Sequence, residues 1–268
     1  MAGPVAVTLV ANAGVLVEHE GLGLLVDGMH REDGHAFSRV PEADLDRMRQ
    51  GSAPFAALDY LLFTHEHPDH FTPRLVLEHI RRRPVRGVIL PGEAGGSPDL
   101  ALLLRNLLFQ AVPHWPLALE PGRTRRIALA DGLTVTGLGA RHMGPQYQAV
   151  CNACFLVSLH GVNLLFTGDA DHVAAYYEPL RDVALDAVFV NPLFYHAEVG
   201  QEIIDTIFRP RHVVVYHLPF ERDDVLHFGR MVRRDVDKHG QPGVRTHVLQ
   251  EAGQRLRLDA AEPGETGA

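Results

Sequence analysis

The sequence has no excess of positive charge. Its 268 residues include 33 acidic and 25 basic residues, which gives a formal net charge of −8. Proteins that hold nucleic acid through its phosphates present a basic face, so this balance argues against a nucleic-acid binder. The one local basic run, Arg81 to Arg83 with Arg86, falls at the end of a predicted helix, where positive charge favours the helix dipole. Lys238 is the only lysine, a bias that we attribute to codon composition.

Long apolar runs and a targeting segment are also missing. No run approaches the length of a membrane span, and the N-terminus lacks the basic and apolar regions of a signal peptide. The two cysteines, Cys151 and Cys154, are too few for a disulfide framework, and in a strand they would face opposite sides. We interpret them as reduced thiols. These absences predict a cytoplasmic protein without a membrane partner.

Length and composition predict one large α/β domain. Apolar residues make up 46% and aromatic residues 7%, an ordinary globular profile. Strands are expected at about 5–10, 15–18, 22–26, 58–63, 88–90, 124–129, 133–138, 154–159, 162–167, 186–190, 212–216 and 245–249. Helices are expected at about 42–50, 72–83, 97–113, 172–180, 199–208 and 223–238. The domain is expected to span residues 1–258, with a small, polar, frayed tail at 259–268.

The most informative segment is the octapeptide 63–70, which follows an apolar strand. His65, His67, Asp69 and His70 fall within a few consecutive positions. Imidazoles and carboxylates are the ligands that zinc and similar divalent metals prefer. His65 and His67 project to the same side of an extended backbone, and a proline then bends the path before Asp69 and His70. The spacing therefore predicts two adjacent metal positions.

Three further segments end a predicted strand with a metal-competent residue. These residues are His142, Asp169 and His217. Residues at strand ends converge on one edge of a sheet, where separate segments can build a site. Each of the three is a weak signal alone, but together with the octapeptide they indicate one metal centre.

The pattern His65-x-His67-x-Asp69-His70, then His142, Gly168-Asp169 and His217, resembles the metallo-β-lactamase-fold superfamily. The opening strands are similar to its lactonase-like branch, typified by ascorbate-6-phosphate lactonase. The resemblance implies a four-layer αββα sandwich of two mixed β-sheets flanked by helices. It also implies that the first metal is held by His65, His67 and His142, and the second by Asp69, His70 and His217, with Asp169 as the bridge. Aspartate rather than cysteine at the bridge weakens a β-lactam interpretation.

The resemblance further implies a metal-dependent hydrolase with a dinuclear site. Two divalent ions, most plausibly zinc with manganese or iron as alternatives, would activate a shared water as hydroxide to cleave a small ester, lactone or phosphate ester. Asp69 and Asp169 are the expected catalytic carboxylates, and Asp69 would hold or relay the proton of the nucleophile. Asp27 and Thr64 are candidates to orient the ligand histidines. The expected partner is a small-molecule substrate; the sequence leaves the oligomeric state open, a homo-oligomer included.

Several residues are candidates for substrate contact. His196, beside Tyr195, is the candidate proton donor to the leaving group, with an ordinary loop histidine as the alternative. Arg141 would pair with an anionic substrate group or form a surface ion pair. The others are His114 and Trp115, as a lid, pocket wall or packed loop, and Phe220, Glu221 and Arg222 at the mouth of the site. Histidines without such a context, His19 and His79 among them, are expected to be exposed.

Three other functions compete with hydrolysis. An iron-dependent oxidoreductase, either sulfur dioxygenase-like or flavodiiron-like, would use similar ligands, although the flavodiiron pattern has a glutamate where His67 stands. The acidic balance disfavours a nuclease, and the complete ligand set disfavours a protein that only binds. Metal analysis separates the first alternative from hydrolysis.

Overall fold

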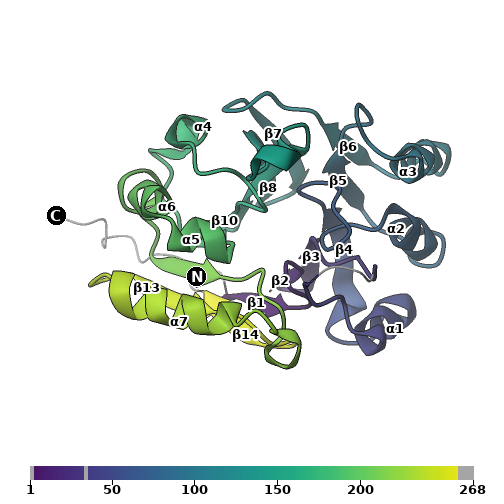
Figure 1. The fold of residues 1–268 in the computed structure, drawn as a ribbon. Coiled ribbons are helices and arrows are strands. Elements are labelled where there is room, and N and C mark those ends of the chain that lie inside the picture. The colour runs from purple at the N-terminus through teal and green to yellow at the C-terminus, as the bar shows by residue number, and fades with distance from the viewer. Residues whose placement is uncertain (1–2, 33–35, 259–268) are drawn as a thin grey trace.

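Two β-sheets packed face to face form the centre of the molecule. The computed structural model describes residues 3–32 and 36–258, which form two seven-stranded sheets (Figure 1). The first sheet has the order β14-β1-β2-β3-β4-β5-β6, with β1 Val5–Leu9, β2 Val15–His19, β3 Leu22–Val26, β4 Leu58–Leu62, β5 Gly87–Pro91, β6 His114–Leu117 and β14 Arg255–Leu258. The second has the order β13-β12-β11-β10-β9-β8-β7, with β7 Thr124–Ala130, β8 Leu133–Arg141, β9 Cys151–Leu159, β10 Val162–Phe166, β11 Ala187–Val190, β12 His212–Val215 and β13 Arg245–Val248. The tail predicted at 259–268 lies outside the described residues.

Both sheets are mixed. In the first sheet β1, β2 and β3 are antiparallel and β3 to β6 are parallel. In the second sheet β7 to β10 are antiparallel and β10 to β13 are parallel. The carboxyl ends of parallel strands meet at one edge of a sheet. Loops that leave β4, β10 and β12 are therefore gathered at shared edges.

Successive side chains along a strand point to opposite faces of the sheet, so both faces of each sheet carry buried side chains. In β4, Tyr60 and Leu62 lie in the core between the sheets, whereas Leu61 and the following Phe63 lie in the core under the helices. A third core fills the outer face of the second sheet. Strands that are buried on both faces require a nearly continuous apolar sequence, and such apolar runs are what predicted these strands.

Helices cover the outer faces of the sandwich (Figure 1). The first sheet is covered by α1 Glu42–Gln50, α2 Pro73–Ile80 and α3 Pro98–Phe109, and the second by α4 Ala174–Tyr177, α5 Pro192–His196, α6 Glu198–Ile203 and α7 Phe228–His239. The predicted αββα sandwich of two mixed sheets is confirmed. Within the described part of the chain, no helix combines the length and apolar character needed to span a membrane.

Some elements end elsewhere than the sequence pattern predicts. Helix α2 stops at Ile80, so Arg81 to Arg83 follow the helix instead of forming its last turn. Helix α3 ends at Phe109, before the predicted stop at 113, and α7 begins at Phe228 after a 3₁₀ turn, later than the predicted start at 223. These differences move helix ends but leave the layers unchanged.

Other predictions from the sequence gave the wrong secondary structure or the wrong exposure. His114 and Trp115, expected as a lid, a pocket wall or a packed loop, lie in edge strand β6, in which Trp115 packs against the central core. Strand β14 was not predicted, because four alternating residues are too short a signal to separate from a loop. His19 and His79 are buried rather than exposed, and His79 lies on α2, which Figure 1 shows between α1 and α3.

Candidate metal centre

Four strand ends bring metal-competent side chains to one edge of the sandwich. The loop after β4 carries the histidine octapeptide, and single residues follow β8, β10 and β12. The structure gathers all the predicted ligands into two groups, in each of which the ligand atoms lie within 4.8 Å of one another. The groups are His65, His67, His142 and Asp169, and Asp69, His70 and His217.

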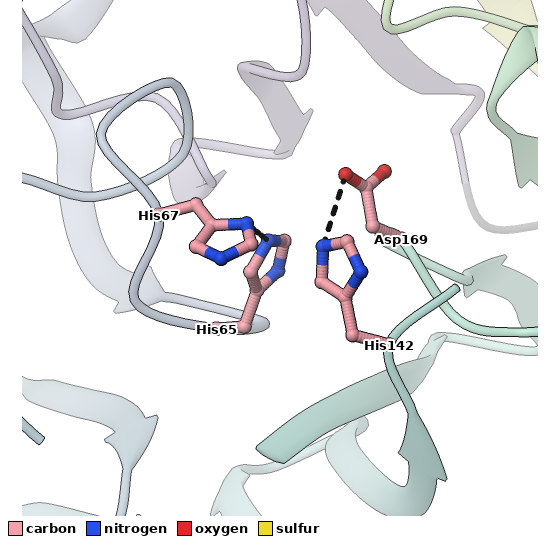
Figure 2. Close-up of side chains that lie close together, drawn as sticks. All are labelled: His65, His67, His142 and Asp169. Atoms are coloured by element: carbon pink, nitrogen blue, oxygen red, sulfur yellow. Dashed lines mark hydrogen bonds and ion pairs between the residues drawn. The ribbon is translucent and has the colours of Figure 1, made fainter. Parts of the chain in front are cut away.

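The first group joins the two sheets. Figure 2 shows His65 and His67 extending from the loop after β4 toward His142 and Asp169, which come from the second sheet. His65 Nε2 lies 3.1 Å from His67 Nδ1. His142 Nε2 lies 3.5 Å from Asp169 Oδ2. Three imidazoles and one carboxylate thus face a common point.

The second group lies directly beside the first. His70 Nε2 is 2.8 Å from His217 Nε2, and His217 Nε2 is 3.3 Å from Asp69 Oδ2. Asp169 reaches this group as well, with Oδ2 3.5 Å from His70 Nε2 and Oδ1 3.5 Å from His217 Nε2. One carboxylate therefore contacts histidines of both groups.

The electrostatics keep the first pair of histidines neutral. Burial, reinforced by His142, lowers the pKa of His67 to about 4. Burial and the nearby His70 also hold the pKa of His65 well below its usual value. A neutral imidazole offers a free nitrogen lone pair, which is the form that binds a metal.

The second group holds protons when no metal is bound. Burial opposes protonation of His70, but the carboxylates of Asp69, Asp169 and Asp27 outweigh it and raise the pKa well above its usual value. Burial opposes protonation of His217 too, and Asp169 and Asp69 raise its pKa. Burial favours the neutral carboxyl form of Asp69 and Asp169, yet these histidines lower the pKa of both carboxyls. Protons on His70 and His217 thus balance part of the buried negative charge.

Asp27 and Thr64 orient ligand histidines, as predicted. The buried Asp27 carboxylate accepts hydrogen bonds from the Thr64 backbone N–H at 2.8 Å and the Thr64 hydroxyl at 2.7 Å. Its Oδ2 also lies 3.0 Å from His70 Nδ1. Thr64 Oγ1 in turn lies 3.0 Å from His65 Nδ1. The network assigns a proton to Nδ1 of both rings, so Nε2 is the atom that each ring would offer to a metal.

Three asparagines that the sequence analysis missed support the carboxylates. Asn12 donates from Nδ2 to Asp69 Oδ2 at 3.3 Å, and Asn191 donates to Asp169 Oδ1 at 3.2 Å. Asn152 Oδ1 accepts from the backbone N–H of Asp169 at 3.2 Å. Asn191 also accepts from Phe194 N–H as the N-cap of α5. The contacts of these asparagines with the centre depend on tertiary structure, which brings together residues that are distant in sequence.

The sequence of residues 39–222 matches the family model of the beta-lactamase superfamily domain, which covers more than half of the chain. The chain belongs to the beta-lactamase superfamily. No curated protein matches it significantly.

Solved structures share the superfamily fold along nearly the whole chain. Igni18, a novel metallo hydrolase from the hyperthermophilic archaeon Ignicoccus hospitalis, aligns with a TM-score of 0.64 at 15% identity, over 96% of this chain and 99% of that one. The metallo-beta-lactamase fold protein YhfI from Bacillus subtilis aligns at 0.59 and 15%, over 95% and 99%. CmlA, a diiron β-hydroxylase from Streptomyces venezuelae, aligns at 0.59 and 20%, over 96% of this chain but 54% of that one. At these identities the likeness establishes the fold alone.

The side chains at this edge fit the divalent metal that the superfamily implies. His142 Nε2 is buried and has no hydrogen-bond partner among the described residues. An unsatisfied buried polar atom costs about 1–3 kcal/mol, and a metal ion would satisfy it. The mixed nitrogen and carboxylate donors suit zinc, manganese or iron.

Two neighbours of the superfamily ligands hold the site in place. Glu66 accepts a hydrogen bond from the Ser97 backbone N–H at 3.0 Å and another from its hydroxyl, which ties the histidine loop to the start of α3. The ring of Tyr147 lies 5.0 Å from that of His67 and 4.9 Å from that of His142. No periodicity in the sequence indicates Tyr147, because it lies in a loop with a short 3₁₀ turn.

Other predicted substrate residues are not brought to the ligands. His196 Nδ1 pairs with Asp235 of α7 at 2.8 Å, and its side chain is 56% exposed. Tyr195 is buried in the outer core of the second sheet and contacts His239. Arg141 is exposed at the end of β8. Within the described chain, neither ligand group includes any of these three.

Of the three residues predicted to line the mouth of the site after His217, some are buried in the fold and some face solvent. Phe220 is buried in the central core, and its N–H donates to Ser38 Oγ at 2.7 Å. Glu221 and Arg222 lie in the 3₁₀ turn, and Arg222 lines an open groove together with Phe37. Arg222 is therefore the one residue of this set that faces an opening near the site.

Proposed function

We propose that the protein is a dinuclear metal-dependent hydrolase of small ester, lactone or phosphate-ester substrates. The observation that carries the proposal is the contact of one carboxylate, Asp169, with His142 of the first group and with His70 and His217 of the second. A ligand in this position can bridge two ions. Superfamily membership and hydrolase neighbours such as Igni18 support the reaction class.

The residues of the chain would perform distinct tasks in this reaction. Bound divalent ions such as zinc would supply Lewis acidity for the substrate oxygen and a water of lowered pKa. Asp69 is ionised, because its pKa is lowered by His70 and His217 against the effect of burial, and it offers an acceptor for the proton of that water. Asn12 and Asn191 hold the two carboxylates in orientation through their amide donors. Asp27 and Thr64 hold His70 and His65.

Metal content and hydrolysis test the proposal together. Two zinc or manganese ions per chain and hydrolysis in a screen of lactones, thioesters, phosphodiesters and β-lactams are expected. His67→Ala and Asp169→Ala should each lower the metal content and abolish activity, because each removes a ligand. Full metal occupancy in both variants would contradict the assignment of these ligands.

An iron-dependent oxidoreductase has one supporting observation, the shared fold of the diiron β-hydroxylase CmlA. The same metal analysis decides between the two functions. Iron in the isolated protein, together with oxygen uptake and no hydrolysis, would favour the oxidoreductase.

A further inference from the structure

A small apolar cavity adjoins the second group of ligands. Its volume is about 60 Å³, and its apolar wall consists of Phe37, Met143, Pro192, Leu193 and Phe228. Asp169 and His217 line the same cavity. A group that sits in it is therefore next to the proposed reaction centre.

The wall is fixed to the metal centre on several sides. The ring of Phe37 meets that of His217 edge-on at 4.5 Å and stacks with Phe228 at 6.5 Å. The backbone N–H of Met143 donates to the Asp169 carbonyl at 2.8 Å. Leu193 follows Asn191, whose side chain both caps α5 and contacts Asp169. The cavity and the ligands are thus parts of one arrangement.

Leu193 stands out on its helix. Its side chain remains 50% exposed, whereas Phe194 and Tyr195 beside it are buried. A large apolar side chain at the rim of a cavity gives an apolar ligand a surface to cover. Leu193 therefore limits the cavity on the solvent side.

The apolar cavity itself offers no cation to an anionic substrate group. Among the described residues, its lining includes no arginine or lysine. The groove at Phe37 holds Arg39 and Arg222 among the acidic Glu32, Glu42 and Asp223, and the groove next to His67 is lined by Glu32, Glu66 and Asp99. The arginine of this second groove, Arg74, already pairs with Asp99 at 2.6 Å. Recognition of a phosphate group ordinarily uses arginine or lysine donors that are free to bind it.

The size of the cavity limits the group that it accepts. A cavity of about 150 Å³ accommodates a benzene ring, and one water occupies about 30 Å³ in the liquid. A volume of about 60 Å³ therefore corresponds to a chain of roughly two to four carbons.

From this geometry, and resting on the proposed hydrolase function, we propose that the substrate is a short-chain aliphatic carboxylic ester or lactone whose alkyl group sits against Phe37, Met143, Leu193 and Phe228. In the reaction the bond between the acyl carbon and the leaving oxygen breaks, and a bond forms from that carbon to the oxygen of water. One proton of the water ends on the leaving oxygen, so an ester gives a short carboxylic acid and an alcohol, and a lactone gives one hydroxy acid.

The rate profile of a series of esters tests the size of the pocket. The zinc-loaded protein is assayed with 4-nitrophenyl acetate, butyrate, hexanoate and octanoate, and with 4-nitrophenyl phosphate. We expect kcat/KM to rise by up to about four-fold per methylene as far as butyrate, and then to fall. The phosphate should be the poorest substrate. A flat profile, or phosphate as the best substrate, would overturn the assignment of the cavity and leave a hydrolase.

A pair of variants links the profile to the wall. Leu193→Ala should shift the optimum from butyrate toward hexanoate, because it removes the rim of the cavity. Val199→Ala on α6 is the matched control, because Val199 is also 50% exposed but does not line the cavity. Its profile should equal that of the unmodified protein. An unshifted optimum in Leu193→Ala, with both variants folded by circular dichroism, would contradict the proposal.

Binding without turnover separates this proposal from the hydrolase function. Calorimetric titration with acetate, butyrate, octanoate and inorganic phosphate should give the tightest binding for butyrate, and Leu193→Ala should weaken that preference. If the protein hydrolyses no ester but retains this preference, the hydrolase proposal fails and the cavity assignment stands. Equal binding of acetate and butyrate would overturn the cavity assignment.

Discussion

A single buried carboxylate, Asp27, orients histidines of both ligand groups, so its replacement by asparagine is a sharp test of the centre. Asp27 Oδ1 accepts from the Thr64 backbone N–H, and Oδ2 contacts the Thr64 hydroxyl and His70 Nδ1. The backbone φ of Asp27 is 46°, in the left-handed region that asparagine tolerates better than most residues. Asp27→Asn therefore changes the donor pattern with little backbone strain.

The amide can fit this position in only one useful orientation. A backbone N–H is always a donor, so the amide oxygen must face Thr64 N–H and the NH₂ group must face His70 Nδ1. That nitrogen then has to accept, which moves the ring proton of His70 to Nε2, the atom that faces His217 at 2.8 Å. The Thr64 hydroxyl is also freed to donate to His65 Nδ1, which promotes the same change in the other group. A protonated Nε2 has no lone pair for a metal.

We expect Asp27→Asn to weaken metal affinity by about 10- to 100-fold, the usual effect of losing a partner that orients a metal ligand. Each tenfold loss is about 1.4 kcal/mol of binding free energy. Competition with a chromophoric chelator measures the affinity, and metal content after dialysis measures occupancy. The hydrogen bonds to the charged Asp27 carboxylate contribute about 1.5–3 kcal/mol each to stability, so the substitution also destabilises the fold. The free energy of unfolding should therefore be measured in parallel.

Asp186→Asn is the matched control. Asp186 is also a buried carboxylate that accepts a backbone N–H, from Asn163 at 2.8 Å, but it precedes β11 and lies at the end of that strand away from the ligands. The control should lower stability without changing metal affinity. Unchanged affinity in Asp27→Asn, or an equal loss in Asp186→Asn, would refute the role assigned to Asp27.

Two further predictions concern pH. Metal affinity should increase as the pH rises through and above the ordinary histidine pKa of 6.5, because the raised pKa values of His70 and His217 make the metal displace protons there. A titration that releases no protons would contradict this. The free energy of unfolding of the metal-free protein should fall as the pH drops from about 6.5 toward 4. Burial lowers the pKa of His79 and His212 to about 4. In this pH range the unfolded chain therefore binds protons that the folded chain does not. This contribution is fully present above pH 6.5, and replacing both histidines by glutamine should reduce the pH dependence in denaturant titrations; an unchanged dependence would count against it.

The grouping of the candidate metal ligands could be predicted because each lies at the end of an apolar strand, or in the loop that follows one. A buried strand can be recognised in the sequence, and the residue that follows it must lie at the end of that strand, at the edge of the sheet. The sequence could therefore place His142, Asp169 and His217 near the octapeptide. The same rule selected His196, which also follows a buried strand, as a substrate residue, and that role stays a prediction. Asparagine caps a helix there, and the helix turns this histidine toward α7 instead.

The supporting residues could not be predicted because their partners are distant in sequence. Asn12 contacts Asp69 from a position 57 residues away in the sequence. Tyr147 lies against His67 and His142 from a loop whose path depends on the packed sheets. The strands determine which candidate ligands come together, whereas the conformation of the loops determines which residues contact and orient those ligands.

The charge of the centre connects the proposed metal number to the proposed reaction. Asp27, Asp69 and Asp169 contribute three negative charges at this edge, and in the metal-free protein protons on His70 and His217 offset up to two of them. Two divalent ions in place of those protons would turn a net charge of about minus one into about plus one, whereas a single divalent ion would leave it at minus one. A centre with positive charge remaining stabilises the negative charge that develops on a substrate oxygen, and a negative centre opposes it. This charge balance supports the proposal that both groups of ligands hold an ion during hydrolysis.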